Sequence, residues 1–258
     1  MEKRLEILIT NDDSINAEGI NLLANIMKSY GNVTVVAPLL PQSGKSAALS
    51  LGEKLYLKET YREEGLIKYT FTGTPVDCIK IGINECLSGK KPDIIVSGIN
   101  HGSNCSVASL YSGTLGACIE GTIYGVPSIG FSLNTHDPSP DFSGIIKYIN
   151  VILDNFLSNP PATGVYLNVN FPNLPAEKIT GIKFARRGKG MWVKEFETYE
   201  DPEEGRYFVM AGHFHNLDEE EHIADHKLVK QGYITIVPHN IDNTDYSEIS
   251  RLSSVWKL

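Results

Sequence analysis

Two adjacent carboxylates, Asp12 and Asp13, lie one residue after a short apolar run, Leu5–Thr10, near the beginning of the chain. Adjacent carboxylates repel each other, so keeping both ionised in a folded protein is unfavourable unless something compensates their charge. A divalent cation is the simplest compensation, because hard metal ions take oxygen ligands. The dipeptide taken alone rather favours a helix N-cap on a solvated loop, where it would have no chemical role.

Two further segments offer oxygen donors after predicted strands. Ser43 and Gly44 follow the run Val33–Ala37, and Asn100 follows the run Asp93–Ser97 in a glycine-rich stretch. Carboxylate, hydroxyl and amide oxygens suit Mg²⁺, Mn²⁺ or Ca²⁺ better than zinc. Together with the two carboxylates, these segments predict an all-oxygen cation site.

A second kind of site is indicated at the helix start that begins with Ser112. A Ser-Gly-Thr helix start exposes unpaired backbone N–H groups and hydroxyls at the positive end of the helix dipole, which suits a phosphate. Plain N-capping is the alternative role for the hydroxyls. The predicted phosphate-binding residues are Gly44, Asn104, Ser112, Gly113 and Thr114. A metal beside an anion-binding helix end indicates phosphate-ester chemistry.

The histidines and the exposed aromatic residues carry weaker signals. His222 and His226 have i,i+4 spacing but lack the glutamate of the HExxH zinc motif, which favours a solvated helical face. His101 lies inside the glycine-rich stretch, where it could contact a ligand. Trp192 and Phe196 are predicted to pack, although an arm that folds over a neighbouring site could use one of them for a nucleobase.

Strands and helices alternate over the first part of the chain and would position these residues. Strands are expected at Leu5–Thr10, Val33–Ala37, Asp93–Ser97, Ser128–Ser132 and Gly164–Val169, helices at Ala17–Tyr30, Pro75–Leu87, Gly113–Tyr124 and Phe142–Leu157, and a hairpin from Leu55–Leu57 to Lys68–Phe71. Continuous β-branched runs are typical of strands covered on both faces. The pattern predicts an α/β fold with a doubly wound, mostly parallel sheet. In such sheets, ligands bind at the carboxyl ends of strands where the strand order reverses.

The second half of the chain has a different pattern. Apolar and polar residues alternate from about residue 179 to 213, which predicts a projecting β-ribbon arm. We divide the chain into a catalytic core (1–178), the arm (179–213), a return helix and strand of the core (214–240) and a C-terminal tail (241–258). The tail shows no clear period and is expected to lie as a surface strap. Arm and tail are both candidate contacts between subunits.

Composition excludes some functional classes. The 258 residues include 23 Lys and Arg against 31 Asp and Glu, a net charge of −8, with no basic run that would coat DNA. No apolar run approaches the roughly 18 residues that span a bilayer, so no membrane partner is expected. The four cysteines show no CxxC spacing and no export signal is visible, which predicts reduced thiols and a cytoplasmic location.

In their order, these segments resemble the SurE family (stationary-phase survival proteins), which are metal-dependent nucleoside-monophosphate phosphatases. The segments are ILITNDDSINAEGI (7–20), VVAPLLPQSGKSAALS (35–50), GTPVDC (73–78), PDIIVSGINHGSN (92–104), YSGTLGACIEG (111–121) and LNVNFP (167–172). The resemblance implies a Rossmann-like core, one divalent cation per subunit (Mg²⁺ or Mn²⁺) and a dimer or tetramer built by the arm and the tail. By position, the family's metal ligands fall on Asp12, Asp13, Ser43 and Asn100.

The expected reaction is hydrolysis of nucleoside 5′-monophosphates, with 3′-monophosphates as further candidates, to nucleoside and phosphate. Asp12 and Asp13 are the expected catalytic residues. The nucleophile is either water or an Asp carboxylate. Water is favoured because phosphatases with a carboxylate nucleophile typically carry DxD, and this chain has DD. Many family members carry an acidic pair where this chain reads CSVASL (105–110).

Two other functions fit parts of the pattern. One is a phosphate- or nucleotide-binding module that binds metal without turnover. The other is a metal-dependent deacetylase, in which an Asp pair also follows the first strand. Deacetylase sites use histidine ligands as well, and no histidine flanks the Asp pair in this sequence.

Overall fold

The computed structural model describes residues 4–135, 137, 139–218 and 223–257. The strands are β1 (Leu5–Thr10), β2 (Gly31–Pro38), β3 (Leu57–Glu63), β4 (Leu66–Phe71), β5 (Ile94–His101), β6 (Ser128–Asn134), β7 (Val165–Pro172), β8 (Gly181–Phe184), β9 (Gly190–Val193), β10 (Phe196–Asp201), β11 (Gly205–Met210), β12 (His213–Asn216) and β13 (Tyr233–Asn240). The helices are α1 (Glu18–Met27), α2 (Pro75–Ile81), α3 (Gly113–Ile123), α4 (Ile146–Ser158), α5 (Asp225–Lys230) and α6 (Tyr246–Val255), with a π-helical turn at Gly82–Cys86 and 3₁₀ turns at Ser106–Leu110 and Ala176–Lys178.

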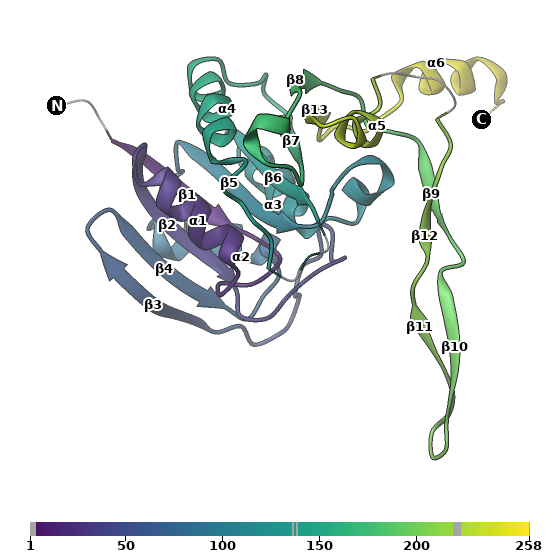
Figure 1. The fold of residues 1–258 in the computed structure, drawn as a ribbon, viewed down its shortest axis with the longest axis horizontal. Helices are drawn as coiled ribbons and strands as arrows, with labels where there is room; N and C mark the ends of the chain where they lie inside the picture. The colour runs from purple at the N-terminus through teal and green to yellow at the C-terminus, as the bar shows by residue number, and fades with distance from the viewer. Residues whose placement is uncertain (1–3, 136, 138, 219–222, 258) are drawn as a thin grey trace.

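Nine strands form one sheet in the order β3-β4-β2-β1-β5-β6-β7-β13-β8. The strands from β4 to β7 run parallel to one another, β3 and β13 are antiparallel to β4 and β7, and β8 is parallel to β13. The chain winds outward from β1 through β2 to β4 and then returns to the other side of β1 with β5 (Figure 1). The predicted doubly wound, mostly parallel α/β fold is confirmed, and its strand order reverses between β1 and β5.

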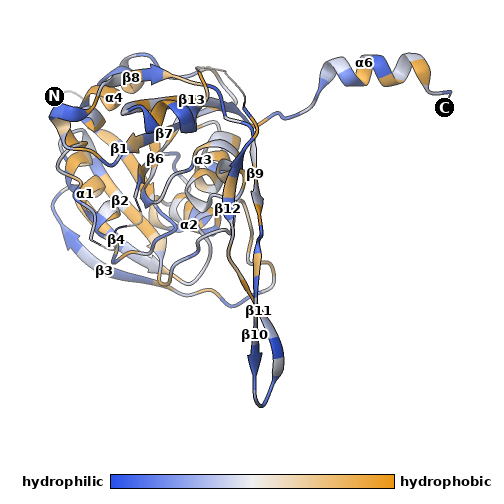
Figure 2. Cartoon of the chain, turned by 45° about the vertical axis from the view of Figure 1, so that its right-hand side comes forward, coloured by the Kyte–Doolittle hydropathy of each residue, from blue (hydrophilic) through white to orange (hydrophobic). Residues whose placement is uncertain are grey.

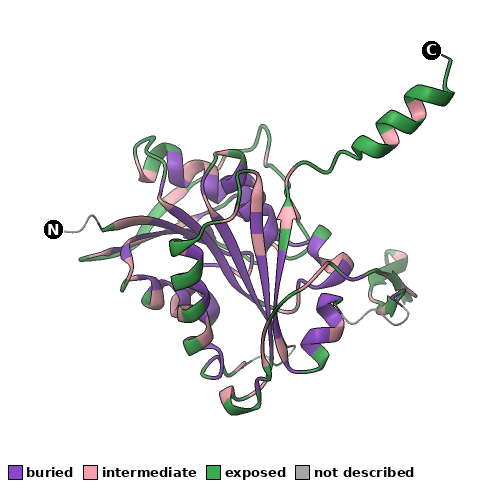
Figure 3. Ribbon diagram, turned by 90° about the horizontal axis from the view of Figure 1, so that it is seen from above, coloured by how far each residue is buried: buried purple, intermediate pink, exposed green. Residues whose placement is uncertain are grey.

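Helices cover both faces of the sheet, which explains the continuous apolar strands. Along β1, Ile7 and Ile9 pack in a cluster that includes residues of α1 and α4, while Leu8 packs in a second cluster with residues of α2 and α3. Successive strand residues point to opposite faces, so a strand covered on both sides is apolar at every position. The sheet is accordingly the most buried part of the molecule (Figure 3).

Several boundaries differ from the sequence-based expectations. The helix expected at Pro75–Leu87 changes to a π-helical turn after Ile81. The hairpin strands are longer than expected, because β3 and β4 include most of the residues between Leu57 and Lys68. The chain turns only at Glu64 and Gly65, where Gly65 has φ +76°. The glycine-rich stretch expected to be a loop after residue 97 is part of β5, with an irregular register between Ser97 and Asn100.

A two-stranded ribbon projects from the core (Figure 1), formed by β9 with β12 and, farther out, β10 with β11. It begins later than the expected arm, because Gly181–Phe184 pairs with β13 and so belongs to the main sheet. The alternation of apolar and polar residues could not show whether Gly181–Phe184 pairs within the ribbon or with the main sheet, because a ribbon strand and an edge strand have the same period.

The tail forms a helix rather than an irregular strap. The Asp245 carboxylate accepts a hydrogen bond from the Glu248 N–H and caps α6, which explains why a helix begins there. In both views α6 stands away from the rounded core (Figures 1 and 2), and none of its residues is buried. No helix in the described part of the chain combines the length and the apolarity needed to cross a membrane.

Candidate metal and phosphate site

The edge of the sheet at the carboxyl ends of β1, β2 and β5 brings together residues from three segments. Asp12 and Asp13 follow β1 after one intervening residue, Asn11, and Asn100 lies near the end of β5. The backbone N–H of Gln42 donates to the carbonyl of Asp12 at 2.7 Å, which joins the loop that carries Ser43 to the Asp pair. Because the strand order reverses between β1 and β5, this edge is where an open parallel sheet binds its ligands.

Asp12 is held inside the protein, with 4% of its surface exposed. The pKa of Asp12 is raised to about 6, mainly because the buried carboxylate loses its hydration and to a smaller extent because the charge of Asp13 lies close by. Thr114 acts in the opposite direction, because its hydroxyl donates to Asp12 Oδ1 at 2.6 Å and its backbone N–H also favours the ionised form. The carboxylate is therefore oriented but its charge is not neutralised.

Asp13 has a similar but more open environment. The backbone N–H of His101 donates to Asp13 Oδ2 at 2.9 Å, so β5 orients this carboxylate across the switch point. Burial raises the pKa of Asp13, while the N–H and the charge of His101 lower it. His101 is thus brought beside the Asp pair by the fold, although the sequence separates them widely.

The charge and donor chemistry of this edge fit a divalent cation. Among the described residues, no basic side chain forms an ion pair with Asp12 or Asp13. The same residues contain no cluster of three or more His, Cys, Asp or Glu placed to share a metal ion. A cation here would therefore use the carboxylates together with hydroxyl, amide and water oxygens, the set that Mg²⁺ and Mn²⁺ prefer to zinc.

The two uncharged predicted ligands have different surroundings. Asn100 is 9% exposed, and its Nδ2 donates to the carbonyl of Gly102 at 2.8 Å, which orients the amide and directs Oδ1 away from that partner. Ser43 is exposed on the loop after β2. Ser46 anchors that loop to the segment before α3, because its N–H donates to the Tyr111 carbonyl at 3.0 Å and its hydroxyl to the Leu110 carbonyl at 2.8 Å.

The start of α3 contacts Asp12 closely. A Cβ on Gly113 would lie 2.8 Å from Cβ and 3.0 Å from Oδ2 of Asp12, so glycine is needed for this approach. The Ser112 hydroxyl accepts the Leu115 N–H at 3.1 Å and caps the helix. The hydroxyls predicted to hold a phosphate thus both have partners inside the protein, Leu115 for Ser112 and Asp12 for Thr114. Gly113 and Gly44 offer backbone groups instead, and Gly44 has φ +75° with open space around it.

Asn104 belongs to a buried polar network that the sequence analysis missed. Its Nδ2 donates to the Ser132 hydroxyl at 2.8 Å and its N–H to Asn170 Oδ1 at 2.8 Å. Asn168 donates to the Asn104 carbonyl at 2.9 Å, and Asn170 donates to Asn168 Oδ1 at 2.9 Å. The signal for these residues is the alternation of two asparagines in the strand LNVNFP, where polar groups on a buried strand require partners. The side chain of Asn104 therefore supports the loop that follows Asn100.

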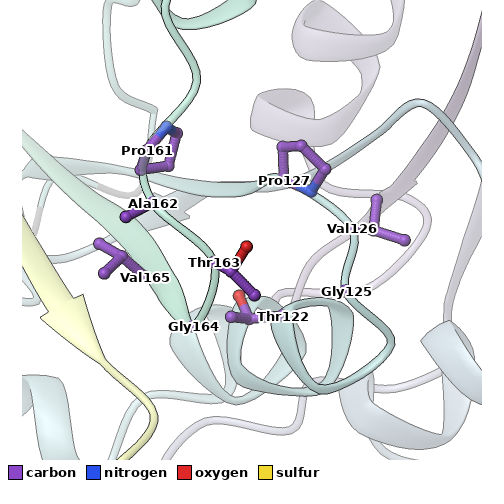
Figure 4. A pocket seen from close by; sticks show the side chains of 9 residues that line it. All are labelled: Thr122, Gly125, Val126, Pro127, Pro161, Ala162, Thr163, Gly164 and Val165. Carbon is purple, nitrogen blue, oxygen red and sulfur yellow. The ribbon is translucent and has the colours of Figure 1, made fainter.

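Other predicted positions lie elsewhere. His226 interacts through Nε2 with Asn216 Oδ1 at 2.9 Å, away from the Asp pair, and His222 lies outside the described residues. A hollow of about 250 Å³ adjoins the site and is lined by Asp13, Glu18, His101 and Phe142 among others. A smaller hollow of about 70 Å³ lies at the opposite edge of the sheet, between the loops that precede β6 and β7 (Figure 4).

Comparison with known proteins gives a consistent result. The family model described as survival protein SurE matches residues 7–194. Proteins named 5′-nucleotidase SurE from Cytophaga hutchinsonii (41% identical, over 98% of this chain and 97% of that protein) and Christiangramia forsetii (42% identical, over 100% and 98%) are similar along their whole length. The crystal structure of the SurE protein from Aquifex aeolicus superposes with a TM-score of 0.82 at 34% identity, covering 96% of this chain and 98% of that one. The chain therefore belongs to the survival protein SurE family.

Proposed function

We propose that the chain is a divalent-metal-dependent phosphatase that hydrolyses nucleoside 5′-monophosphates, and also 3′-monophosphates, to nucleoside and phosphate. The observation that carries the proposal is the pair of oriented, uncompensated carboxylates, Asp12 and Asp13, at the switch point of the sheet. Relatives that match the chain over nearly their full length bear the name 5′-nucleotidase. The 3′ activity and a cytoplasmic location stay predictions from the sequence.

The proposed cofactor is one Mg²⁺ or Mn²⁺ per subunit, held by Asp12, Asp13, Ser43 and Asn100. A bound divalent cation supplies Lewis-acid activation of the phosphoryl group and of the attacking water. Thr114 and the His101 N–H keep the two carboxylates in place, so little reorganisation is needed when the cation binds. The donor set supports this choice of metal because it contains only oxygen atoms.

The phosphate would be held mainly by backbone groups. The N–H of Gly113 lies at the amino end of α3, which is the positive end of the helix dipole, and the Gly44 N–H lies on the open loop after β2. These donors stabilise negative charge on the non-bridging oxygens as the bond to the leaving group breaks. In this scheme the Ser112 hydroxyl supports the start of α3 through its hydrogen bond from Leu115. The Asn104 amide supports the loop after Asn100 through its hydrogen bond to Ser132.

Phosphate release from AMP, measured with Mg²⁺ or Mn²⁺ and then with excess EDTA, tests the proposal. We expect release that EDTA abolishes and added metal restores. The Asp12→Asn, Asp13→Asn double variant should be inactive while it remains folded. Nucleotide binding without phosphate release would favour the non-catalytic module instead. The deacetylase alternative is not supported, because the described residues hold no histidine-containing metal cluster.

We further propose that the ribbon and α6 join subunits into a dimer or tetramer. The outer ribbon exposes large apolar side chains, among them Phe196, Phe208 and Met210, which are 59%, 53% and 75% exposed. An isolated two-stranded ribbon is marginally stable in water, and exposed apolar patches of this kind usually mark interfaces. Sedimentation of the full chain tests this part of the proposal.

A further inference from the structure

A third hollow, of about 250 Å³, lies between the base of the ribbon, the 3₁₀ turn at Ser106–Leu110 and helix α5. We call it the ribbon-base pocket. The residues that matter for its chemistry are Ser103, Asn134, Trp192, Phe214, His226 and Lys230. None of them belongs to the carboxylate site described above, and the ribbon and α5 contribute most of them.

One wall of the ribbon-base pocket is aromatic. Trp192 on β9 and Phe214 on β12 are paired across the ribbon, with ring centroids 6.4 Å apart in an edge-to-face arrangement. Phe214 in turn contacts the ring of His226 on α5, with centroids 5.2 Å apart. Trp192 remains 37% exposed despite these contacts, so part of its indole is available to a ligand.

The carboxylate of Asp225 holds the walls of the ribbon-base pocket together before any ligand binds. This side chain is fully buried and accepts hydrogen bonds from the N–H groups of Ser106 at 2.9 Å, Gly188 at 2.9 Å and His226 at 2.7 Å. The Ser106 hydroxyl also donates to the Gly188 carbonyl at 2.9 Å. One carboxylate thus joins the 3₁₀ turn, the ribbon base and α5 into one unit, so the pocket is preorganised.

The pocket lies within one nucleotide's reach of the carboxylate site. Asn100, a proposed metal ligand, is the register partner of Ser132 on the neighbouring strand β6. Asn134, which lines the pocket, is two residues farther along β6, or about 7 Å at the usual rise of a strand. Ser103, on the same lining, lies three residues beyond Asn100.

We propose that the ribbon-base pocket receives the base of the nucleoside monophosphate, with the indole of Trp192 against the base and the Asn134 amide at its polar edge. The inference rests on the proposed nucleotidase function, whose substrate carries its base one ribose away from the phosphate. Aromatic faces stack on any base, and an amide can both donate to and accept from a base edge. The volume is below the roughly 300 Å³ typical of sites for whole drug-sized ligands, which suits a part of the nucleotide.

Direct binding can be tested by tryptophan fluorescence. The chain has two tryptophans, and the conservative Trp256→Phe change leaves Trp192 as the only one. This variant, loaded with Mg²⁺, is titrated with adenosine and, separately, with ribose, because neither is hydrolysed. We expect a saturable change of fluorescence with adenosine and none with ribose. An unchanged fluorescence with adenosine, or the same change with both compounds, overturns the inference.

Kinetics provide the second test. Trp192→Leu should raise the KM for AMP roughly tenfold or more, in line with the usual loss on removing a stacking side chain, and leave the KM for ribose 5-phosphate unchanged. Trp192→Phe should restore most of the affinity for AMP, because a stacking face is retained. Tyr56→Leu, which alters a 66% exposed aromatic residue outside the ribbon, is the matched control and should change neither KM. Equal increases for both substrates, or no increase for AMP, overturn the inference.

The two proposals fail in different ways. If wild-type protein releases phosphate from AMP while adenosine leaves the fluorescence of Trp192 unchanged, the ribbon-base pocket is not the base site and the nucleotidase function stands. If adenosine binds at Trp192 but no phosphate is released under any metal, the pocket stands and the proposed catalysis fails.

Discussion

The hydroxyl of Thr114 donates a 2.6 Å hydrogen bond to Oδ1 of Asp12 and so joins the first turn of α3 to the residue pair after β1. Both groups are buried, with 0% and 4% of their surfaces exposed. The sequence pattern suggested that this hydroxyl contacts phosphate, but in the fold it orients the carboxylate. The helix start therefore acts on the site through Asp12.

Replacement of Thr114 by valine should lower kcat/KM roughly 10- to 100-fold, the usual effect of losing a partner that orients a metal ligand. The shape is retained, but Asp12 loses a donor that lowers its pKa, so metal affinity should fall as well. Thr114→Ser should keep most of the activity. Thr122→Val is the matched control, because that buried hydroxyl donates only to the Cys118 carbonyl on the same helix. Wild-type activity in Thr114→Val would contradict the role.

Asp12→Asn should stabilise the metal-free protein in a pH-dependent way. Burial raises the pKa of Asp12 from 3.8 to about 6, so the folded protein binds this proton more tightly than the unfolded chain. The penalty for ionised Asp12 is absent below about pH 4 and fully present above pH 6, where it is on the order of 3 kcal/mol. Thermal unfolding in EDTA should therefore show a higher Tm for the variant at pH 8 and a nearly equal Tm at pH 4. An equal Tm at both values would be inconsistent with an uncompensated carboxylate.

Gly113→Ala should reduce activity at least tenfold, because the new Cβ would lie 2.8 Å from Cβ of Asp12 and displace the carboxylate. Alanine otherwise favours a helix by roughly 0.5–1 kcal/mol over glycine, so a general loss of helix stability cannot explain the effect. Metal affinity, measured by calorimetry, should fall in parallel with kcat. A fully active variant would show that Asp12 can move without loss of function.

Ser112→Ala separates capping from phosphate binding. The hydroxyl caps α3 by accepting the Leu115 N–H, so its loss should lower the stability by about 1 kcal/mol and change kcat little. Thermal unfolding and steady-state kinetics on the same preparation measure both effects. A fall in kcat of about 100-fold, the range seen when a donor to developing charge is removed, would restore the direct phosphate role.

Deletion of residues 245–258, which keeps the contacts of Ile241 with the core, should shift the sedimentation profile towards smaller species. Helix α6 has no buried residue and stands away from its own core, so its loss should leave the folding of the core unchanged. Near-native circular dichroism of the shortened chain is the control for folding. A full-length protein that sediments as a monomer at micromolar concentration and is fully active would contradict the proposed assembly.

The sequence by itself determined the class of fold and which segments reach the site. Strand β1 was predicted with its observed bounds, Leu5–Thr10, and helix α3 was predicted as Gly113–Tyr124, one residue longer than observed. Continuous apolar runs identify strands that are covered on both faces, and polar residues directly after them mark the carboxyl edge of a parallel sheet. The family could also be identified from the order of its motifs, which the comparisons confirm.

Only the tertiary structure decided which groups meet. The partner of the Thr114 hydroxyl, the approach of the His101 N–H to Asp13 and the hydrogen bonds from Ser106 and Gly188 to Asp225 all join residues far apart in the chain. The tertiary structure also decided the partner of β8. Its alternation of apolar and polar residues fits a ribbon strand equally well, but it pairs with β13. Local patterns report which face a residue takes, because they depend on the period of one element. Hydrogen-bond partners depend on how several elements pack, and that packing settles only when the whole core forms.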